Sequence, residues 1–143
     1  MNEQVSAAGP TRILVIDDSN TIRRSAEIFL KQGGHEVALA EDGFDALAKL
    51  GDFHPDLVFC DILMPRLDGY QTCAIIKRNP RFAHVPVIML SSKDGLFDKA
   101  RGRMVGSQDY LTKPFTKEQL LRAVQQFGSS PAGTAVQQPP SAE

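Results

Sequence analysis

The side chains that could do chemistry in this sequence share one position, because each stands directly after a short apolar run. The apolar runs cover residues 13–16, 37–40, 57–60, 87–90 and 110–112. The polar residues that follow four of these runs are Asp17, Asp18, Asp61, Ser91, Ser92 and Lys113. If the runs are strands of one parallel sheet, their carboxyl ends lie at the same edge, where open α/β sheets bind ligands. The pattern predicts one small polar site at that edge.

Three aspartates at one site need a compensating cation. Two unit charges 4 Å apart repel by about 4 kcal/mol at an effective dielectric of about 20. Lys113 supplies one positive charge, which leaves a cleft with a net charge near −2 that suits Mg²⁺. An aspartate beside the metal can act as a nucleophile and form an acyl phosphate. The metal, Lys113 and a serine hydroxyl would then stabilise the phosphoryl oxygens.

The elements that must position these residues follow from the spacing of the runs. The runs end at intervals of 20 to 30 residues, which leaves room for a helix between each pair. The first four are continuous rather than alternating, which predicts strands buried on both faces of a parallel sheet. The weaker fifth run suits an edge strand. Strand and helix in alternation predict a doubly wound α/β fold with a five-stranded parallel sheet and five helices.

Helix signals lie between the runs. Apolar residues at helical spacing predict amphipathic helices at each end of the domain; they are Ile22, Ala26 and Phe29 in the first helix and Leu120, Val124 and Phe127 in the last. Gly33 and Gly34 are expected to end the first helix. Thr116 followed by Gln119 predicts a capping box at the start of the last helix. Asp68-Gly69 is expected to form the turn that starts the third helix.

Composition indicates one small domain with polar tails. The chain has 143 residues, of which 42% are hydrophobic and 23% charged, with a mean hydropathy of −0.20. We expect a flexible tail at 1–10, a single folded domain at 11–127 and a disordered tail at 128–143, which is rich in proline and poor in large apolar side chains. No apolar stretch reaches the roughly 20 residues of a membrane span, and no secretory signal is seen, so a cytoplasmic location is expected.

Charge is unevenly distributed. Residues 1–70 hold 12 acids and 6 bases, a net charge of −6, whereas residues 71–127 hold 10 bases and 4 acids, a net charge of +6. Ordinary solvated faces would explain this, and so would an acidic pocket in the first half and a basic partner-binding surface in the second. Without a run of consecutive bases, nucleic acid binding is not expected. Cys60 and Cys73 lie in apolar runs and are expected to be buried free thiols rather than a disulfide.

Four local motifs resemble those of a known protein family. They are Val15-Ile16-Asp17-Asp18-Ser19, Cys60-Asp61-Ile62-Leu63-Met64-Pro65, Leu67-Asp68-Gly69 and Leu111-Thr112-Lys113-Pro114-Phe115. Taken in order, each at a strand end, they resemble the CheY-like receiver domains of two-component response regulators over residues 11–127. The resemblance implies a protein that accepts a phosphoryl group from a histidine kinase and switches partner binding, with no reaction on a free substrate.

The resemblance also implies roles for individual residues. Asp61 would be the phospho-acceptor and would contact Mg²⁺. Asp18 would be a direct metal ligand, Asp17 would hold the metal largely through water, and the Leu63 backbone carbonyl would complete the protein ligands.

The signalling residues are assigned by the same resemblance. Ser91 would be the hydroxyl switch, and Lys113 would contact the phosphoryl group through a loop in which its bond to Pro114 is cis. The ring of Tyr110 would move inward when Ser91 turns; plain packing is the alternative for this tyrosine. The signal would leave through a basic face within residues 93–127.

Longer segments around 42–48, 66–73 and 91–100 are similar to single-domain regulators of type IV pilus chemosensory systems. That similarity implies a chemosensory histidine kinase as phosphodonor and the pilus machinery, in twitching motility, as the downstream partner. A flagellar chemotaxis receiver is the alternative output.

Several structural alternatives remain at this point. Asp17 and Asp18 could cap the following helix, and Lys93 could recruit an acidic phosphodonor or be a solvated surface residue. Leu63 cannot orient a water molecule, so the lifetime of a phosphorylated state is open. The three histidines, expected at the surface rather than as metal ligands, are His35, His54 and His84.

Other functional classes fit less well. An aspartate-nucleophile phosphatase is expected to carry Asp-x-Asp after its first strand and a cap domain, whereas this strand is followed by adjacent aspartates and the chain leaves no residues for a cap. A flavodoxin-like cofactor carrier would need a Gly- or Ser/Thr-rich phosphate-binding loop after the first strand, and the sequence has no such loop at that position. A pseudo-receiver would lack part of the set formed by Asp17, Asp18, Asp61, Ser91 and Lys113.

Overall fold

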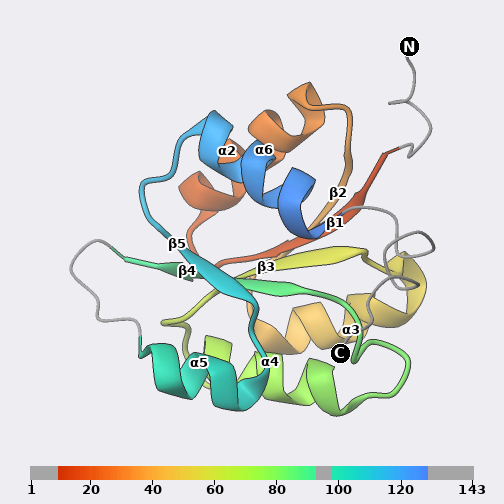
Figure 1. Cartoon of the computed structure of the whole chain (residues 1–143), viewed down its shortest axis with the longest axis vertical. Coiled ribbons are helices and arrows are strands. Elements are labelled where there is room, and N and C mark those ends of the chain that lie inside the picture. Colours follow the sequence, from red (N-terminus) through yellow and green to blue (C-terminus); the bar gives the residue numbers. More distant parts are fainter. Residues whose placement is uncertain (1–9, 93–97, 129–143) are drawn as a thin grey trace.

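The computed structural model describes residues 10–92 and 98–128, in which strand and helix alternate (Figure 1). The strands are β1 (Arg12–Ile16), β2 (Glu36–Ala40), β3 (Leu57–Asp61), β4 (Val87–Ser91) and β5 (Asp109–Thr112). The helices are α2 (Asn20–Gln32), α3 (Gly43–Phe53), α4 (Gly69–Arg78), α5 (Lys99–Val105) and α6 (Lys117–Phe127). All strands pair in parallel in the order β2-β1-β3-β4-β5. The predicted doubly wound five-stranded α/β fold with five helices is confirmed.

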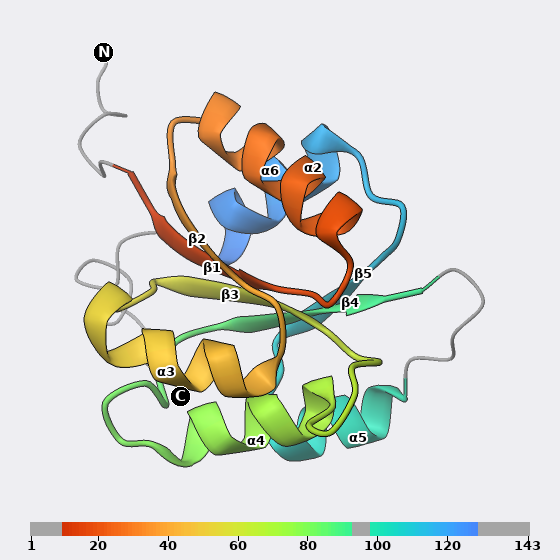
Figure 2. The same cartoon turned by 180° about the vertical axis from the view of Figure 1, so that it is seen from behind.

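The helices cover the sheet from both sides. Helices α2 and α6 lie on one face, and α3, α4 and α5 lie on the other (Figures 1 and 2). Successive residues of β1 therefore serve different cores: Ile13 and Val15 pack with α2 and α6, whereas Leu14 and Ile16 pack with α3 and α4. This explains the continuous apolar runs, since side chains that alternate between two covered faces are all buried.

The second strand departs from expectation. We expected the first four runs to be buried on both faces, and β3 and β4 are entirely buried. In β2 only Ala40 is fully buried, and Glu36 is exposed. The reason is its position at the sheet edge beside β1, which leaves one side without a neighbouring strand. The prediction that β5 is an edge strand is confirmed.

Local signals at the helix ends act as predicted. The Asp68 side chain accepts from the Gln71 backbone N–H to start α4, and Thr116 does the same with Gln119 to start α6, both as capping boxes. Gly33 ends α2. The peptide bond between Lys113 and Pro114 is cis, as expected.

The two cysteines are buried free thiols as predicted, whereas one of the three histidines is not fully exposed at the surface. Cys60 and Cys73 are buried and free. His54 and His84 are exposed, but His35 is half-buried, and its Nδ1 accepts a hydrogen bond from the Thr11 backbone N–H at 3.2 Å. The expectation that all three histidines are surface residues is therefore wrong for His35, because the start of β1 covers it.

Some predictions fall outside the described residues. These are the placement of Lys93 and almost all of the two tails, 1–10 and 128–143. At the tail boundary, Gly128 is described and buried; its N–H bonds the Val124 carbonyl, and its carbonyl accepts from the Thr11 hydroxyl at 3.2 Å. Within residues 10–92 and 98–128, no helix is long and apolar enough to span a bilayer.

Two glycines give a test of the packing that positions Asp61. A Cβ on Gly69 would lie 2.3 Å from the Asp61 backbone oxygen, whereas a Cβ on Gly51 would meet nothing within 4 Å. We expect Gly69→Ala to lower the free energy of unfolding by about 1–3 kcal/mol through overpacking. Gly51→Ala, inside helix α3, should raise it by about 0.5–1 kcal/mol. Urea unfolding measures both, and equal effects would contradict the packing described.

Candidate functional site

The three predicted aspartates meet at the carboxyl edge of the sheet. Asp17 and Asp18 follow β1, Asp61 ends β3, and the two strands pair with Ile16 opposite Cys60. One carboxylate oxygen from each aspartate lies within 4.8 Å of the others. Asp17 and Asp61 are buried, whereas Asp18 is exposed. The adjacent central strands therefore bring together residues 44 positions apart in the chain.

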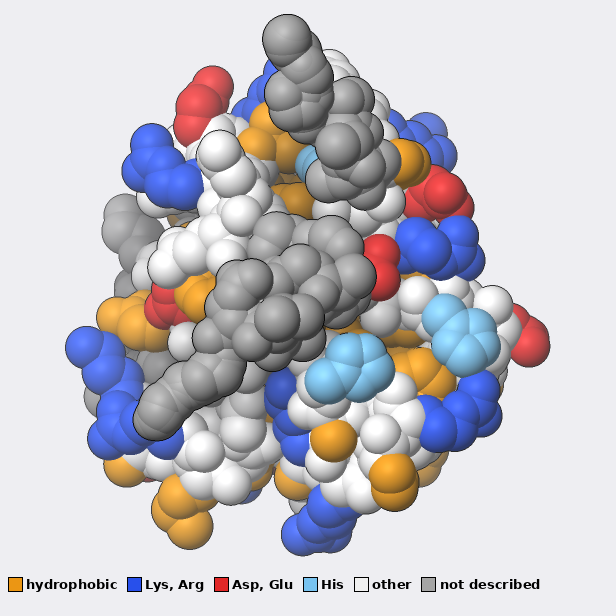
Figure 3. All heavy atoms as spheres, turned by 45° about the vertical axis from the view of Figure 1, so that its right-hand side comes forward, with side chains coloured by type: hydrophobic (Ala, Val, Ile, Leu, Met, Phe, Trp, Pro, Cys, Tyr) orange, Lys and Arg blue, Asp and Glu red, His pale blue; other side chains and the backbone are white. Residues whose placement is uncertain are grey.

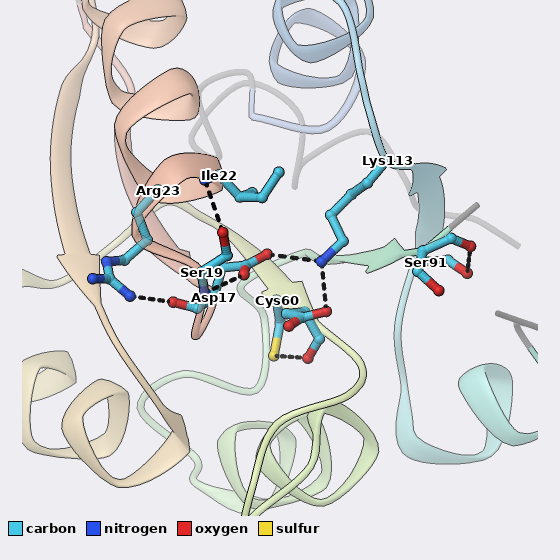
Figure 4. Close-up of polar contacts among 9 residues, drawn as sticks. Asp17, Ser19, Ile22, Arg23, Cys60, Ser91 and Lys113 are labelled. Atoms are coloured by element: carbon cyan, nitrogen blue, oxygen red, sulfur yellow. Dashed lines mark hydrogen bonds and ion pairs between the residues drawn. The ribbon is translucent and has the colours of Figure 1, made fainter. Parts of the chain in front are cut away.

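A lysine from the far side of the site joins two of these carboxylates. The Lys113 Nζ donates to Asp61 Oδ1 at 3.0 Å and to Asp17 Oδ2 at 3.2 Å (Figure 4). Its side chain is only 15% exposed. The Lys113 backbone N–H bonds the Ser91 carbonyl at 2.7 Å, which extends the pairing of β4 and β5 by one residue. The ammonium thus lies where it offsets the buried negative charge.

Burial and charge alter the acidity of the cluster. Burial, reinforced by the negative charge of Asp17, raises the pKa of Asp61 from 3.8 to about 7, although the hydrogen bond from Lys113 opposes this rise. Burial also raises the pKa of Asp17. For Lys113, burial lowers the pKa, but the hydrogen bond to Asp61 and the charge of Asp17 outweigh it and raise the pKa overall. One lysine is thus not enough to hold every carboxylate ionised at neutral pH.

Asp17 is held by contacts that its own strand and helix provide. Its Oδ1 accepts from the Ser19 N–H at 2.9 Å, and its backbone carbonyl accepts from the Arg23 Nη1 at 2.6 Å (Figure 4). Ser19, not an aspartate, caps α2, because its hydroxyl oxygen accepts from the Ile22 N–H. The capping alternative for Asp17 and Asp18 is therefore wrong, and the carboxylates remain directed to the cluster.

Two residues, Arg23 and Gly69, hold the site through contacts that the sequence motifs do not predict. Arg23, the fourth residue of α2, reaches back to the Asp17 backbone carbonyl, a contact that no standard capping pattern uses. Gly69 packs against the Asp61 backbone and bonds the Ile62 carbonyl at 2.8 Å. The Asp68-Gly69 pair predicts a turn, but the contact of Gly69 with the Asp61 backbone depends on how the loop folds back and is not encoded locally.

Ser91 and Tyr110 lie on neighbouring strands beside the cluster. Ser91 is 4% exposed, and its hydroxyl donates to the Ser92 carbonyl at 3.4 Å (Figure 4). Tyr110 is half-buried at the sheet edge, with the Lys99 Nζ 5.8 Å from its ring centroid. Their switching roles stay predictions. The Leu63 side chain is 68% exposed, and its backbone carbonyl as a metal ligand likewise stays a prediction.

The donor set fits Mg²⁺. Asp17, Asp18 and Asp61 provide hard oxygen ligands close enough to share one ion, and Mg²⁺ favours one or two carboxylates with waters completing the octahedron. The exposed position of Asp18 leaves a side for those waters and for a phosphoryl oxygen. Among the His, Cys, Asp and Glu side chains of the described residues, these three aspartates form the group spaced closely enough to hold a metal ion.

Known proteins are similar to this domain in sequence. A family model described as the response regulator receiver domain matches residues 13–125. Over 113 residues, the chain is 67% identical to the protein PilG of Pseudomonas aeruginosa, covering 79% of this chain and 84% of PilG. It is 39% identical over 113 residues to the protein PilH of the same species, covering 79% of this chain and 93% of PilH.

Solved structures agree. The chemotaxis protein CheY4 of Vibrio cholerae superposes with a TM-score of 0.79 at 31% identity, covering 83% of this chain and 99% of CheY4. A putative response regulator from Chloroflexus aurantiacus superposes with a TM-score of 0.77 at 33% identity, covering 82% of this chain and 97% of that one.

The raised pKa of Asp61 predicts how stability varies with pH. Between pH 3.8 and about 7 the folded state holds a proton on Asp61 that the unfolded state releases, so the free energy of unfolding falls as pH rises through this window. Asp61→Asn should remove that part of the slope and stabilise the metal-free protein at pH 8 by on the order of 1–3 kcal/mol. Chemical unfolding at pH 5 and pH 8 without divalent cations measures this.

The exposed Asp52, which makes no ion pair among the described residues, gives the matched control. Asp52→Asn should retain the wild-type slope. A wild-type slope in Asp61→Asn would show that the buried cluster carries no strain.

Proposed function

Because the chain belongs to the response regulator receiver domain family, we propose that it accepts a phosphoryl group on Asp61 from a histidine kinase. The observation that carries the proposal is the Lys113 ammonium joining Asp17 and Asp61 inside a three-carboxylate cluster. In this site Asp61 is buried and already bonded to a cation, and Asp17 and Asp18 lie close enough to hold a metal beside it. The phosphorylated state is the signal.

The transfer uses the Asp61 carboxylate as the nucleophile. An oxygen of Asp61 attacks the phosphorus of a phosphohistidine, the P–N bond breaks, and the imidazole nitrogen leaves with its electron pair and takes up a proton. Lys113 already fixes the carboxylate through Oδ1 at 3.0 Å, so little reorientation is needed before attack. Lys113 then donates to the phosphoryl oxygens. Mg²⁺, when held by Asp17, Asp18, Asp61 and the Leu63 carbonyl, supplies further charge neutralisation.

The switch begins at Ser91. Its hydroxyl bonds the adjacent Ser92 carbonyl at 3.4 Å, a long hydrogen bond that a phosphoryl oxygen can replace. Rotation of this buried hydroxyl frees space next to the edge strand, where Tyr110 would turn inward. The reaction involves the protein's own side chain, so we assign a signalling module rather than an enzyme acting on a free substrate.

The output face lies over α5, β5 and α6. Its described bases are Lys99, Arg101, Arg103, Lys117 and Arg122. Arg101 is turned toward α4, where its guanidinium lies 4.3 Å from the Tyr70 ring centroid and 3.8 Å from Asp68. The other bases leave this face positive, so partners with acidic surfaces and salt-sensitive binding are expected.

The biological setting we propose is a type IV pilus chemosensory system in the cytoplasm. The kinase would be its chemosensory histidine kinase, and the downstream partners would belong to the pilus machinery that drives twitching. The support is the 67% identity to PilG together with the resemblance of the segments at 42–48, 66–73 and 91–100. The chain is only 31% identical to the chemotaxis protein CheY4, so the flagellar alternative has weaker support than the pilus assignment.

Intact mass spectrometry tests the phosphoryl acceptor. Incubation with Mg²⁺ and acetyl phosphate should add the mass of one phosphoryl group, and Asp61→Asn should abolish the gain because the nucleophile is lost. Asp52→Asn should be phosphorylated as the wild type is. Omission of Mg²⁺ should slow the gain at least about tenfold. An undiminished gain in Asp61→Asn, or none in the wild type at saturating donor, would contradict the assignment.

Complementation tests the pilus assignment. In a P. aeruginosa strain lacking PilG, expression of this chain should restore twitching zones, and Asp61→Asn at equal protein level should not, because the variant cannot be phosphorylated. Restoration of twitching by Asp61→Asn would remove the phosphorylation requirement. A wild-type chain that alters only swimming chemotaxis would favour the flagellar alternative.

A further inference from the structure

The amino edge of the sheet carries a groove that the phosphorylation site does not use. It lies between the last turns of α3 and α4 and the loop before β4, with a volume of about 570 Å³. Its apolar lining comes from Leu47, Leu50, Ile75 and Phe82. Both helices begin at the carboxyl edge, near Asp61, and run away from it. The groove is therefore at the opposite end of the molecule from the phospho-acceptor.

The base of the groove is rigid. Leu50 and Phe82 are 4% and 3% exposed, so they are fixed in the core. The loop that forms one wall is held by the Lys77 Nζ, which donates to the carbonyls of Ala83 at 3.2 Å and Val85 at 2.6 Å. A partner would bind a preformed surface and would not have to order this loop.

The rest of the apolar surface remains open. Ile75 is 38% exposed on α4, and a Cβ built on Gly51 of α3 would meet nothing within 4 Å. Gly51 thus leaves a gap between the helices at the point where a side chain from a partner could enter. The volume of about 570 Å³ lies within the roughly 300–1,000 Å³ range of ligand-binding clefts.

Two arginines give the groove its charge. Arg78 and Arg81 line it and are exposed. Neither forms an ion pair with a carboxylate in the described part of the chain; the Arg81 guanidinium lies 5.3 Å from the Phe82 ring centroid. Figure 3, which brings the amino edge of the sheet forward, shows hydrophobic side chains flanked by basic ones and by histidines there.

We propose that this groove binds an acidic amphipathic helix of a partner protein. Apolar side chains at helical spacing would fill the gap beside Gly51 and Ile75, and carboxylates on the flanks would pair with Arg78 and Arg81. A helix fits because the walls are themselves helices and present no open strand edge. A partner held there leaves Asp61 and the α5–β5 face uncovered, so the groove tethers the protein while it is phosphorylated and read.

Two other occupants fit the chemistry less well. A second copy in a symmetric dimer would bring the same groove, and so arginine against arginine, into contact. The segment 129–143 of this chain offers a single acid, Glu143, and Val136 as its one branched apolar side chain. Neither supplies the acidic and apolar pattern that the groove requires.

Fluorescence anisotropy with the full chain tests the proposal. The probe is a fluorescein-labelled synthetic helical peptide with Leu on one face and Glu on the flanks, and the control peptide has Lys in place of Glu. We expect the acidic peptide to bind and Arg78→Glu with Arg81→Glu to weaken it by about tenfold or more. Arg24→Glu with Lys31→Glu, the same change of four charges made on helix α2 at the opposite face of the sheet, should change the affinity by less than about twofold. Equal binding of the Lys peptide, or equal effects of the two charge reversals, would overturn the proposal.

A second variant separates loss of binding from loss of folding. Gly51→Leu should fill the groove and abolish peptide binding with a melting temperature at or above that of the wild type, because the position is open and leucine is a better helix former. Wild-type affinity in Gly51→Leu would overturn the proposal. Peptide-induced NMR shifts confined to α5 and β5 would also overturn it, because the peptide would then bind another face. If Gly51→Leu moves the resonances of residues 129–143 without peptide, the groove holds the chain's own tail instead. If Gly51→Leu dissociates a dimer, the groove holds a second copy instead.

Discussion

The contact on which the site depends is the Lys113 ammonium bonded to Asp17 and Asp61 at once. Three strands that are not consecutive in the chain must end at the same level for this contact to form: β1 supplies Asp17, β3 supplies Asp61, and the loop after β5 supplies Lys113. Without the lysine, two carboxylates would be buried side by side with no counter-charge. Even with it, the pKa of Asp61 is raised to about 7. The folded protein thus retains unfavourable charge that a metal ion can relieve, which is why the site is suited to hold one.

Much of this arrangement could be predicted from sequence, because each functional residue stands at the end of a strand. Buried parallel strands are continuous apolar runs, and the residue after such a run lies at the ligand edge. The position of Asp17, Asp18, Asp61 and Lys113 at one site follows from that rule alone. Capping residues such as Thr116 are equally local signals.

What could not be predicted depends on contacts between distant segments. A four-residue apolar run does not distinguish a central strand from an edge strand, so the partial exposure of β2 was missed. The Arg23 guanidinium bonds the backbone carbonyl of Asp17, and Gly69 packs against the backbone of Asp61. No side-chain pattern in the sequence predicts either contact. The partial burial of His35 requires the segment at the start of β1 to lie over it. Helix α4 shows the same limit: its first residue supports Asp61, and its last, Arg78, lines a groove at the other edge that composition does not reveal.

Asp61 lies in a cluster of carboxylates whose repulsion a divalent cation would relieve. The most direct measurement is an NMR titration of the Asp61 carboxyl carbon in protein labelled with ¹³C at aspartate, with Asp61→Asn to assign the signal. Without metal the midpoint should lie near 7, and saturating Mg²⁺ should move it to lower pH. A midpoint near the ordinary aspartate value of about 3.9 that Mg²⁺ leaves unchanged would contradict the account.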